Sequence, residues 1–188
     1  MPLKVTFELE DKDLKFFRAS IKEAQQKAAN TSEAEITAKA EQMISEVRSN
    51  NVPAFVEQRV DRVQALVDMV RDPEWALAAK ERKDVLAALA YFADPQDIIP
   101  DSVPVLGYID DAIMIELVVS ELKHEIDSFD DFCKYRREER ARNRNPNLSR
   151  EEYLDIKRRQ LQERMRRRRT SARARASGGA RRTRIRLF

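Results

Sequence analysis

The chain has 188 residues, of which only three are glycine and one is cysteine, and its formal net charge is +3. So few glycines exclude the glycine-rich phosphate loops of nucleotide-binding folds, and the single Cys133 excludes an internal disulfide framework and suits a reducing cytoplasm. The small net charge conceals an asymmetry, because residues 1–133 carry a net charge of −12 and residues 134–188 a net charge of +15.

Residues 1–10 are expected to form an N-terminal extended arm. Leu3, Val5, Phe7 and Leu9 alternate with polar residues, which is the pattern of a β-strand. We find no second strand pattern in the sequence that could pair with it. Two alternatives therefore remain open: the arm lies on the helices, or it pairs with the same strand of a second copy in a homodimer.

Residues 11–137 are predicted to form an all-α bundle of about five to six helices. Apolar residues recur there at helical spacing, and Ser32 with Glu35 forms a capping box for the second helix. The third helix carries a seam suited to antiparallel or coiled-coil packing, which is a second candidate dimer surface. Its residues are Val56, Val60, Val63, Val67 and Val70. Asp72-Pro73 predicts the start of a fourth helix.

A proline-rich helical hairpin is predicted at residues 84–119, within this bundle. The first helix must end by Asp94, because Pro95 disfavours helical geometry in the residue before it. Gly107 supplies backbone freedom in the turn, and Asp110 and Asp111 favour the positive end of the second helix.

The segment from residue 94 to residue 111 resembles the motif of the YkvA family, a bacterial domain of unknown function, in which prolines, a glycine and acids stand at fixed offsets. The matching residues are Asp94, Pro95, Asp97, Pro100, Asp101, Pro104, Gly107, Asp110 and Asp111. The resemblance implies a helical hairpin and no assigned reaction. Many relatives look membrane-embedded, whereas Glu116, Ser120 and Glu121 interrupt the second apolar helix here. The longest apolar run, residues 85–93, is also too short to span a bilayer.

The C-terminal part changes character after Cys133. One long helix is expected there, with one apolar face formed by Ile115, Val118, Leu122, Ile126, Phe129 and Cys133. Residues 138–165 then read as a charged helical extension, opened by a capping box at Ser149 and Glu152. Its apolar positions are Tyr153, Ile156, Leu161 and Met165. Residues 166–188 are predicted to form a disordered, arginine-rich tail.

No catalytic, metal or cofactor site is predicted. The aspartates of the hairpin offer oxygen ligands to Mg²⁺ or Ca²⁺, but their spacing fits no calcium loop and each has a capping role. Glu121 and His124 match half of a di-iron site, yet the chain has one histidine. Cys133 lies on an apolar stripe without a nearby histidine. We therefore interpret the chain as non-enzymatic, with no cofactor and no small-molecule substrate.

The arginine tail is the strongest indication of a partner, because the last 25 residues contain eleven arginines and no acid. These are Arg164, Arg166, Arg167, Arg168, Arg169, Arg173, Arg175, Arg181, Arg182, Arg184 and Arg186. Arginine binds phosphate bidentately, and the near absence of aromatic residues argues against base stacking. We expect a cytoplasmic interaction module that binds nucleic acid non-specifically. Two alternatives remain: attachment to anionic lipid at the inner face of the membrane, and folding of the tail onto the acidic body as a switch.

Overall fold

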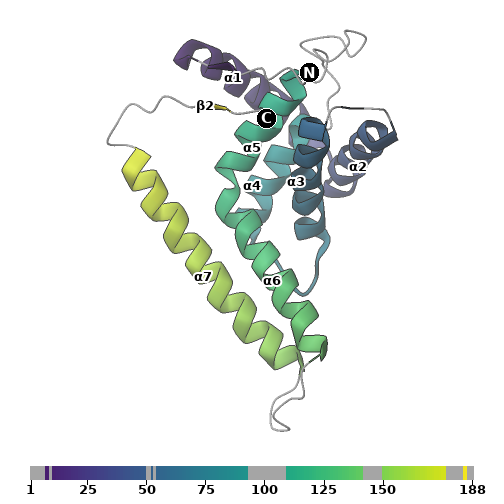
Figure 1. Ribbon diagram of the computed structural model, residues 1–188, viewed down its shortest axis with the longest axis vertical. Coiled ribbons are helices and arrows are strands. Elements are labelled where there is room, and N and C mark those ends of the chain that lie inside the picture. The colour runs from purple at the N-terminus through teal and green to yellow at the C-terminus, as the bar shows by residue number, and fades with distance from the viewer. Residues whose placement is uncertain are drawn as a thin grey trace, which may run out of the picture.

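The computed structural model describes residues 7–8, 10–49, 52, 54–92, 109–141, 150–176 and 184–185. These residues are almost entirely helical, which confirms the predicted all-α class (Figure 1). The elements are β1 (Phe7–Glu8), α1 (Asp11–Lys27), η1 (Ala28–Asn30), α2 (Glu33–Ser49), α3 (Ala54–Arg71), α4 (Ala79–Phe92), α5 (Ile109–Glu121), α6 (Lys123–Ala141), α7 (Arg150–Ala176) and β2 (Arg184–Ile185).

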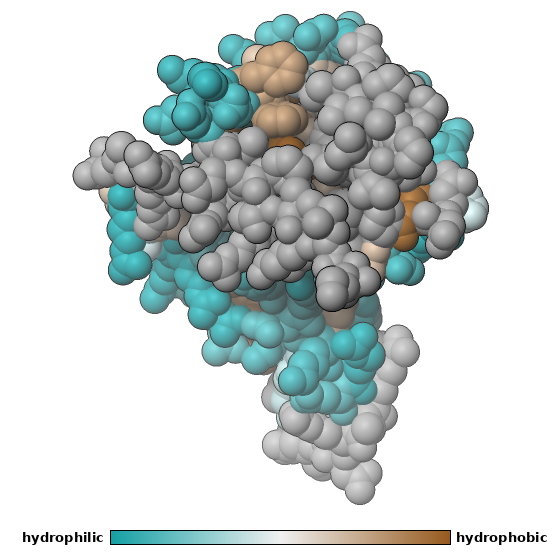
Figure 2. Space-filling view, turned by 45° about the horizontal axis from the view of Figure 1, so that its top comes forward, coloured by the Kyte–Doolittle hydropathy of each residue, from teal (hydrophilic) through white to brown (hydrophobic). Residues whose placement is uncertain are grey.

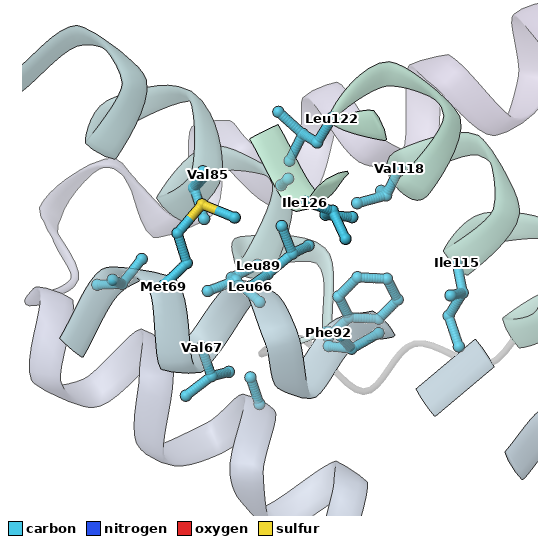
Figure 3. Close-up of a cluster of buried hydrophobic side chains, with 14 of the residues drawn as sticks. Leu66, Val67, Met69, Val85, Leu89, Phe92, Ile115, Val118, Leu122 and Ile126 are labelled. Carbon is cyan, nitrogen blue, oxygen red and sulfur yellow. The ribbon is translucent and has the colours of Figure 1, made fainter. Parts of the chain in front are cut away.

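Helix α3 occupies the centre of the bundle and packs against α2, α4, α5 and α6. All five valines of its predicted seam are buried within the chain. Figure 3 shows how α3 meets α4, α5 and α6 around Leu66, Leu89 and Ile126. Full burial of one such side chain stabilises the fold by about 1.5–3 kcal/mol. The seam is therefore used for intramolecular packing, and dimerisation through it stays a prediction.

The predicted fourth helix does not begin at Asp72-Pro73. Residues 72–78 form a turn instead, in which Asp72 Oδ1 accepts hydrogen bonds from the backbone N–H groups of Glu74 and Trp75, both at 2.9 Å. Ala76 has a φ of 46°, in the left-handed region that a side chain resists, and this geometry is incompatible with a helix. Helix α4 consequently starts only at Ala79.

The long helix expected after residue 115 is divided into α5 and α6 at Leu122. Helical hydrogen bonds continue on both sides, from Leu122 N to Val118 O and from Ile126 N to Leu122 O, each 3.0 Å long. Leu122 is buried, so the chain bends around a side chain that faces the core.

Helix α7 extends further than the sequence predicted. The expected disordered tail began at residue 166, whereas the structure continues the helix to Ala176. Alanine and arginine are both good helix formers, and three arginines of this helix also pair with the body, as described below. Residues 177–183 and 186–188 lie outside the described part, so the prediction for them is untested.

The two short strands pair antiparallel, with Phe7 opposite Ile185 and Glu8 opposite Arg184. This pairing within the chain was not expected, because two residues of the arginine-rich segment carry no recognisable strand pattern. The remainder of the predicted arm, residues 1–6 and 9, lies outside the described residues.

The face of the molecule drawn in Figure 2 is mainly hydrophilic where it is coloured. Figure 2 shows hydrophilic residues over most of the coloured surface, with apolar residues in small separate areas. None of the described helices is both long and apolar enough to cross a membrane.

Candidate functional site

Helix α7 lies along α6 with one apolar face buried (Figure 1). Leu154, Leu161 and Met165 are buried, and their spacing of seven and four residues places them on one side of a helix. Glu151 and Glu152 stand in the first turn and Arg173 and Arg175 in the last, which is the arrangement that the helix dipole favours. The apolar face therefore fixes α7 to the body from Leu154 to Met165.

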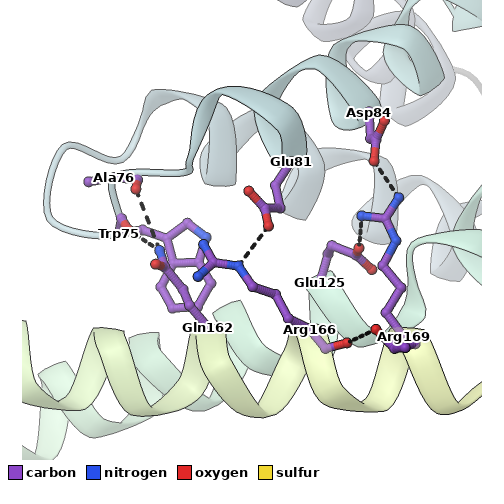
Figure 4. Close-up of polar contacts among 9 residues, drawn as sticks. Trp75, Ala76, Glu81, Asp84, Glu125, Gln162, Arg166 and Arg169 are labelled. Atoms are coloured by element: carbon purple, nitrogen blue, oxygen red, sulfur yellow. Dashed lines mark hydrogen bonds and ion pairs between the residues drawn. The ribbon is translucent and has the colours of Figure 1, made fainter.

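A side-chain amide of α7 holds the turn that carries the only tryptophan (Figure 4). Gln162 Nε2 donates a hydrogen bond of 2.9 Å to the backbone oxygen of Trp75. Trp75 is buried against the rings of Phe129 and Phe132, whose centroids lie 5.8 and 5.3 Å from its own. Arg158 adds a 3.3 Å hydrogen bond to the backbone oxygen of Glu74. The packing of α7 on the body and the surroundings of Trp75 are thus coupled, because Gln162 and Arg158 of α7 bind the turn that carries Trp75.

Arg169 forms the most buried ion pair of this interface. Its Nη1 lies 2.8 Å from Oε1 of Glu125, which is fully buried, and its Nη2 pairs with Asp84 (Figure 4). Only 16% of the Arg169 side chain is exposed. Burial raises the pKa of Glu125, although a backbone hydrogen bond and the charge of Arg169 act in the opposite direction. Burial alone would lower the pKa of Arg169, but Asp84 and Glu125 outweigh it and the net shift is upward.

Two further arginines of α7 pair with body carboxylates but remain accessible to solvent. Arg166 Nε lies 2.8 Å from Oε1 of Glu81, with 49% of the Arg166 side chain exposed. Arg164 pairs with Asp131 of α6, with 42% of its side chain exposed. We call Glu81, Asp84, Glu125 and Asp131 the acidic seat.

Four further arginines near the end of α7 are exposed, and one of them, Arg167, pairs with Glu163 of the same helix. Arg168, Arg173 and Arg175 are exposed, and within the part of the chain that the structure describes their side chains form no ion pair or hydrogen bond. All side chains from 170 to 175 are exposed, so this end of the helix projects beyond the bundle. We call Arg168, Arg173 and Arg175 the outer arginines. They form a cationic end that none of the described carboxylates neutralises.

Most of the hairpin motif lies outside the described residues. This holds for Asp94, Pro95, Asp97, Pro100, Asp101, Pro104 and Gly107, and their predicted roles are untested. Asp110 and Asp111 fall in the first turn of α5, as predicted, but their side chains are not described. Of the predicted tail residues, Arg181, Arg182 and Arg186 are also outside, and Arg184 is in β2.

The described residues contain no group of three or more His, Cys, Asp or Glu side chains that could hold a metal ion. Cys133 is half-buried, and burial raises the pKa of its thiol despite the nearby charge of Arg136. A thiol with a raised pKa is a poor nucleophile at neutral pH.

The acidic seat was not predicted from the sequence. One signal was available, since Glu125 lies three residues after Leu122 and four before Phe129, on the apolar face of the same helix. An acid on a buried face needs a cation, and the arginine-rich segment was the evident source. The partners of Glu81, Asp84 and Asp131 depend on how the helices pack, which sequence spacing does not reveal.

A family model described as "Protein of unknown function (DUF1232)" matches residues 85–117. The match lies within the hairpin predicted at residues 84–119 and supports a domain of unknown function there. No curated protein and no solved structure matches this chain.

Proposed function

We propose that this chain is a non-catalytic interaction protein that binds nucleic acid non-specifically through the end of α7. The observation that carries the proposal is the group of outer arginines, Arg168, Arg173 and Arg175, which are exposed and whose charges no described carboxylate neutralises. Arginine presents a planar fork of donors that matches phosphate oxygens. The tail arginines beyond residue 176 would extend the same contact.

The composition of the exposed end supports nucleic acid over lipid. A helix that binds at a membrane interface presents an apolar face to the lipid. Leu154, Leu161 and Met165 are buried against the body, the exposed Ile156 lies near the opposite end of α7, and residues 170–175 are threonine, serine, alanine and arginine only. Contact with a phosphate backbone needs charge and no apolar face.

We assign no reaction to the YkvA-like hairpin, which in this proposal is part of the scaffold that carries α7. The raised pKa of Cys133 supports a non-enzymatic interpretation. Other partners of the hairpin would not conflict with nucleic-acid binding by α7.

The test compares two triple variants of the full chain with the same net charge. One replaces the outer arginines (Arg168→Gln, Arg173→Gln, Arg175→Gln). The control replaces three lysines with glutamine as well (Lys15→Gln, Lys22→Gln, Lys83→Gln). These lysines are exposed and lie on α1 and α4. Binding of a fluorescently labelled 20-base-pair duplex is followed by anisotropy, and pelleting with vesicles containing phosphatidylserine is measured in parallel.

Because three phosphate contacts are removed, the outer-arginine variant should bind DNA roughly tenfold more weakly or worse than the wild type at moderate salt. The lysine variant should lose much less. Equal losses in the two variants would show that only net charge matters and would refute the assigned site. Binding to anionic vesicles without binding to DNA would refute nucleic acid as the partner and favour the lipid alternative.

A further inference from the structure

Six arginines in the second half of α7 belong to three groups that differ in their access to solvent. Arg169 is enclosed by Asp84 and Glu125, and the outer arginines are exposed without partners among the described residues. Arg164 and Arg166 are intermediate, since each pairs with a carboxylate of the acidic seat while nearly half of its side chain stays exposed. Arg164 also precedes Arg168 by four residues, which places both on one side of the helix.

We propose that nucleic acid competes with the acidic seat for Arg164 and Arg166, and that its binding loosens α7 from the turn that holds Trp75. This inference rests on the proposed function, because it describes how the same binding site is regulated. In the absence of nucleic acid, Arg164 is ion-paired with Asp131 and Arg166 with Glu81. A phosphate backbone bound to the outer arginines brings a dense row of negative charge next to them.

When α7 is packed on the body, several buried polar atoms have no hydrogen-bond partner among the described residues. This lowers the free-energy cost of releasing α7 from the body. Arg164 Nε, Trp75 Nε1 and Glu125 Oε2 are buried and have no hydrogen-bond partner among the described residues. An unsatisfied buried donor or acceptor costs about 1–3 kcal/mol. Loosening of α7 would let water reach these atoms, so part of the packing energy lost on release is recovered.

The competition must act in both directions. If packing of α7 on the body lowers the affinity for nucleic acid, then bound nucleic acid lowers the equilibrium constant for packing of α7 by the same factor. Two consequences can be measured: Trp75 should become more accessible when DNA binds, and removal of the competing carboxylates should strengthen DNA binding.

The first measurement uses the emission of Trp75, which is the only tryptophan of the chain and is fully buried in the seated state. The full chain is titrated with an unlabelled 20-base-pair duplex, and quenching by acrylamide is measured before and after saturation. Acrylamide is neutral, so the charge of the DNA does not repel it. We expect quenching to increase and the emission to shift to longer wavelength.

The second measurement compares two double variants that each remove two negative charges. Glu81→Gln with Asp131→Asn removes the competitors of Arg166 and Arg164. Glu46→Gln with Glu57→Gln removes exposed acids of α2 and α3 instead. The first variant should bind the duplex several-fold more tightly than the second, and circular dichroism checks that both remain folded.

The inference requires both results. If DNA binds while quenching of Trp75 is unchanged, or if the two acid variants bind DNA equally, the competition is refuted and the proposed function stands. If neither the wild type nor any variant binds DNA, the proposed function fails and the inference fails with it.

Discussion

Arg168 and Arg169 are neighbours in a run of four arginines, yet they have opposite environments. Arg169 reaches into the body and contacts two carboxylates, one of which is fully buried. Arg168 is exposed and pairs with no carboxylate among the described residues. A helix turns by about 100° per residue, so adjacent residues of one run can serve stability and binding separately.

Arg169→Gln should lower the free energy of unfolding by about 3 kcal/mol, because it leaves the buried Glu125 without its cation. Arg168→Gln removes the same charge from an exposed position and should leave stability unchanged. Urea denaturation followed by Trp75 fluorescence measures both. In an Glu125→Gln background the cost of Arg169→Gln should shrink, since no buried charge is left unpaired. Equal costs in both backgrounds would contradict the coupling.

Glu125 should also shape the pH dependence of stability. Its pKa in the folded protein is raised above the ordinary value of 4.5, mainly by burial. The folded state therefore binds the proton more tightly than the unfolded state, and the contribution of Glu125 to stability is largest below pH 4.5. This contribution falls as the pH rises from 4.5 towards the raised pKa.

The measurement compares urea unfolding of the wild type and of Glu125→Gln between about pH 4 and pH 7. The free energy of unfolding of the wild type, relative to the variant, should decrease across this range because glutamine does not titrate. Glu57→Gln, at an exposed position of α3, serves as the control and should keep the wild-type profile. Parallel profiles for the wild type and Glu125→Gln would show that Glu125 is not perturbed.

Among the elements, the helices of the bundle were predictable because their apolar residues recur at a fixed period. In a helix with few apolar residues, however, the period does not determine which of them are buried, and α7 is an example. Ile156 was assigned to its apolar face, but 57% of it is exposed, and Leu154 is buried instead. Two residues correspond to about 200° of rotation, so Leu154 and Ile156 cannot face the body together.

The end of α7 was harder to predict for a different reason. Composition alone marks residues 166–176 as too charged to fold independently. In the structure, Arg166 and Arg169 find carboxylates on α4 and α6, and these partners are more than 40 residues away in the sequence. Long-range neutralisation of this kind leaves no local pattern. The turn at residues 72–78 is similar, since the left-handed Ala76 follows no recognised turn sequence.

For the whole molecule, the charge asymmetry between residues 1–133 and 134–188 becomes an intramolecular attraction that is only partly satisfied. The acidic seat neutralises Arg164, Arg166 and Arg169, and the outer arginines stay available. The sequence indicated the asymmetry, but which acids meet which arginines follows only from the packing of α7 on α6. The same helix thus stabilises the bundle and presents its cationic end.

The salt dependence of DNA binding should report how many outer arginines contact phosphate. Each contact on duplex DNA contributes about 0.9 to the slope of log K against log salt concentration, so loss of Arg168, Arg173 and Arg175 should make the slope shallower by about 2.7. The variant with Lys15, Lys22 and Lys83 replaced should keep the wild-type slope, because it changes net charge without removing a contact. Anisotropy titrations at four or more salt concentrations give the three slopes. An unchanged slope in the outer-arginine variant would mean that these side chains do not meet the phosphates, whatever their effect on affinity at one salt concentration.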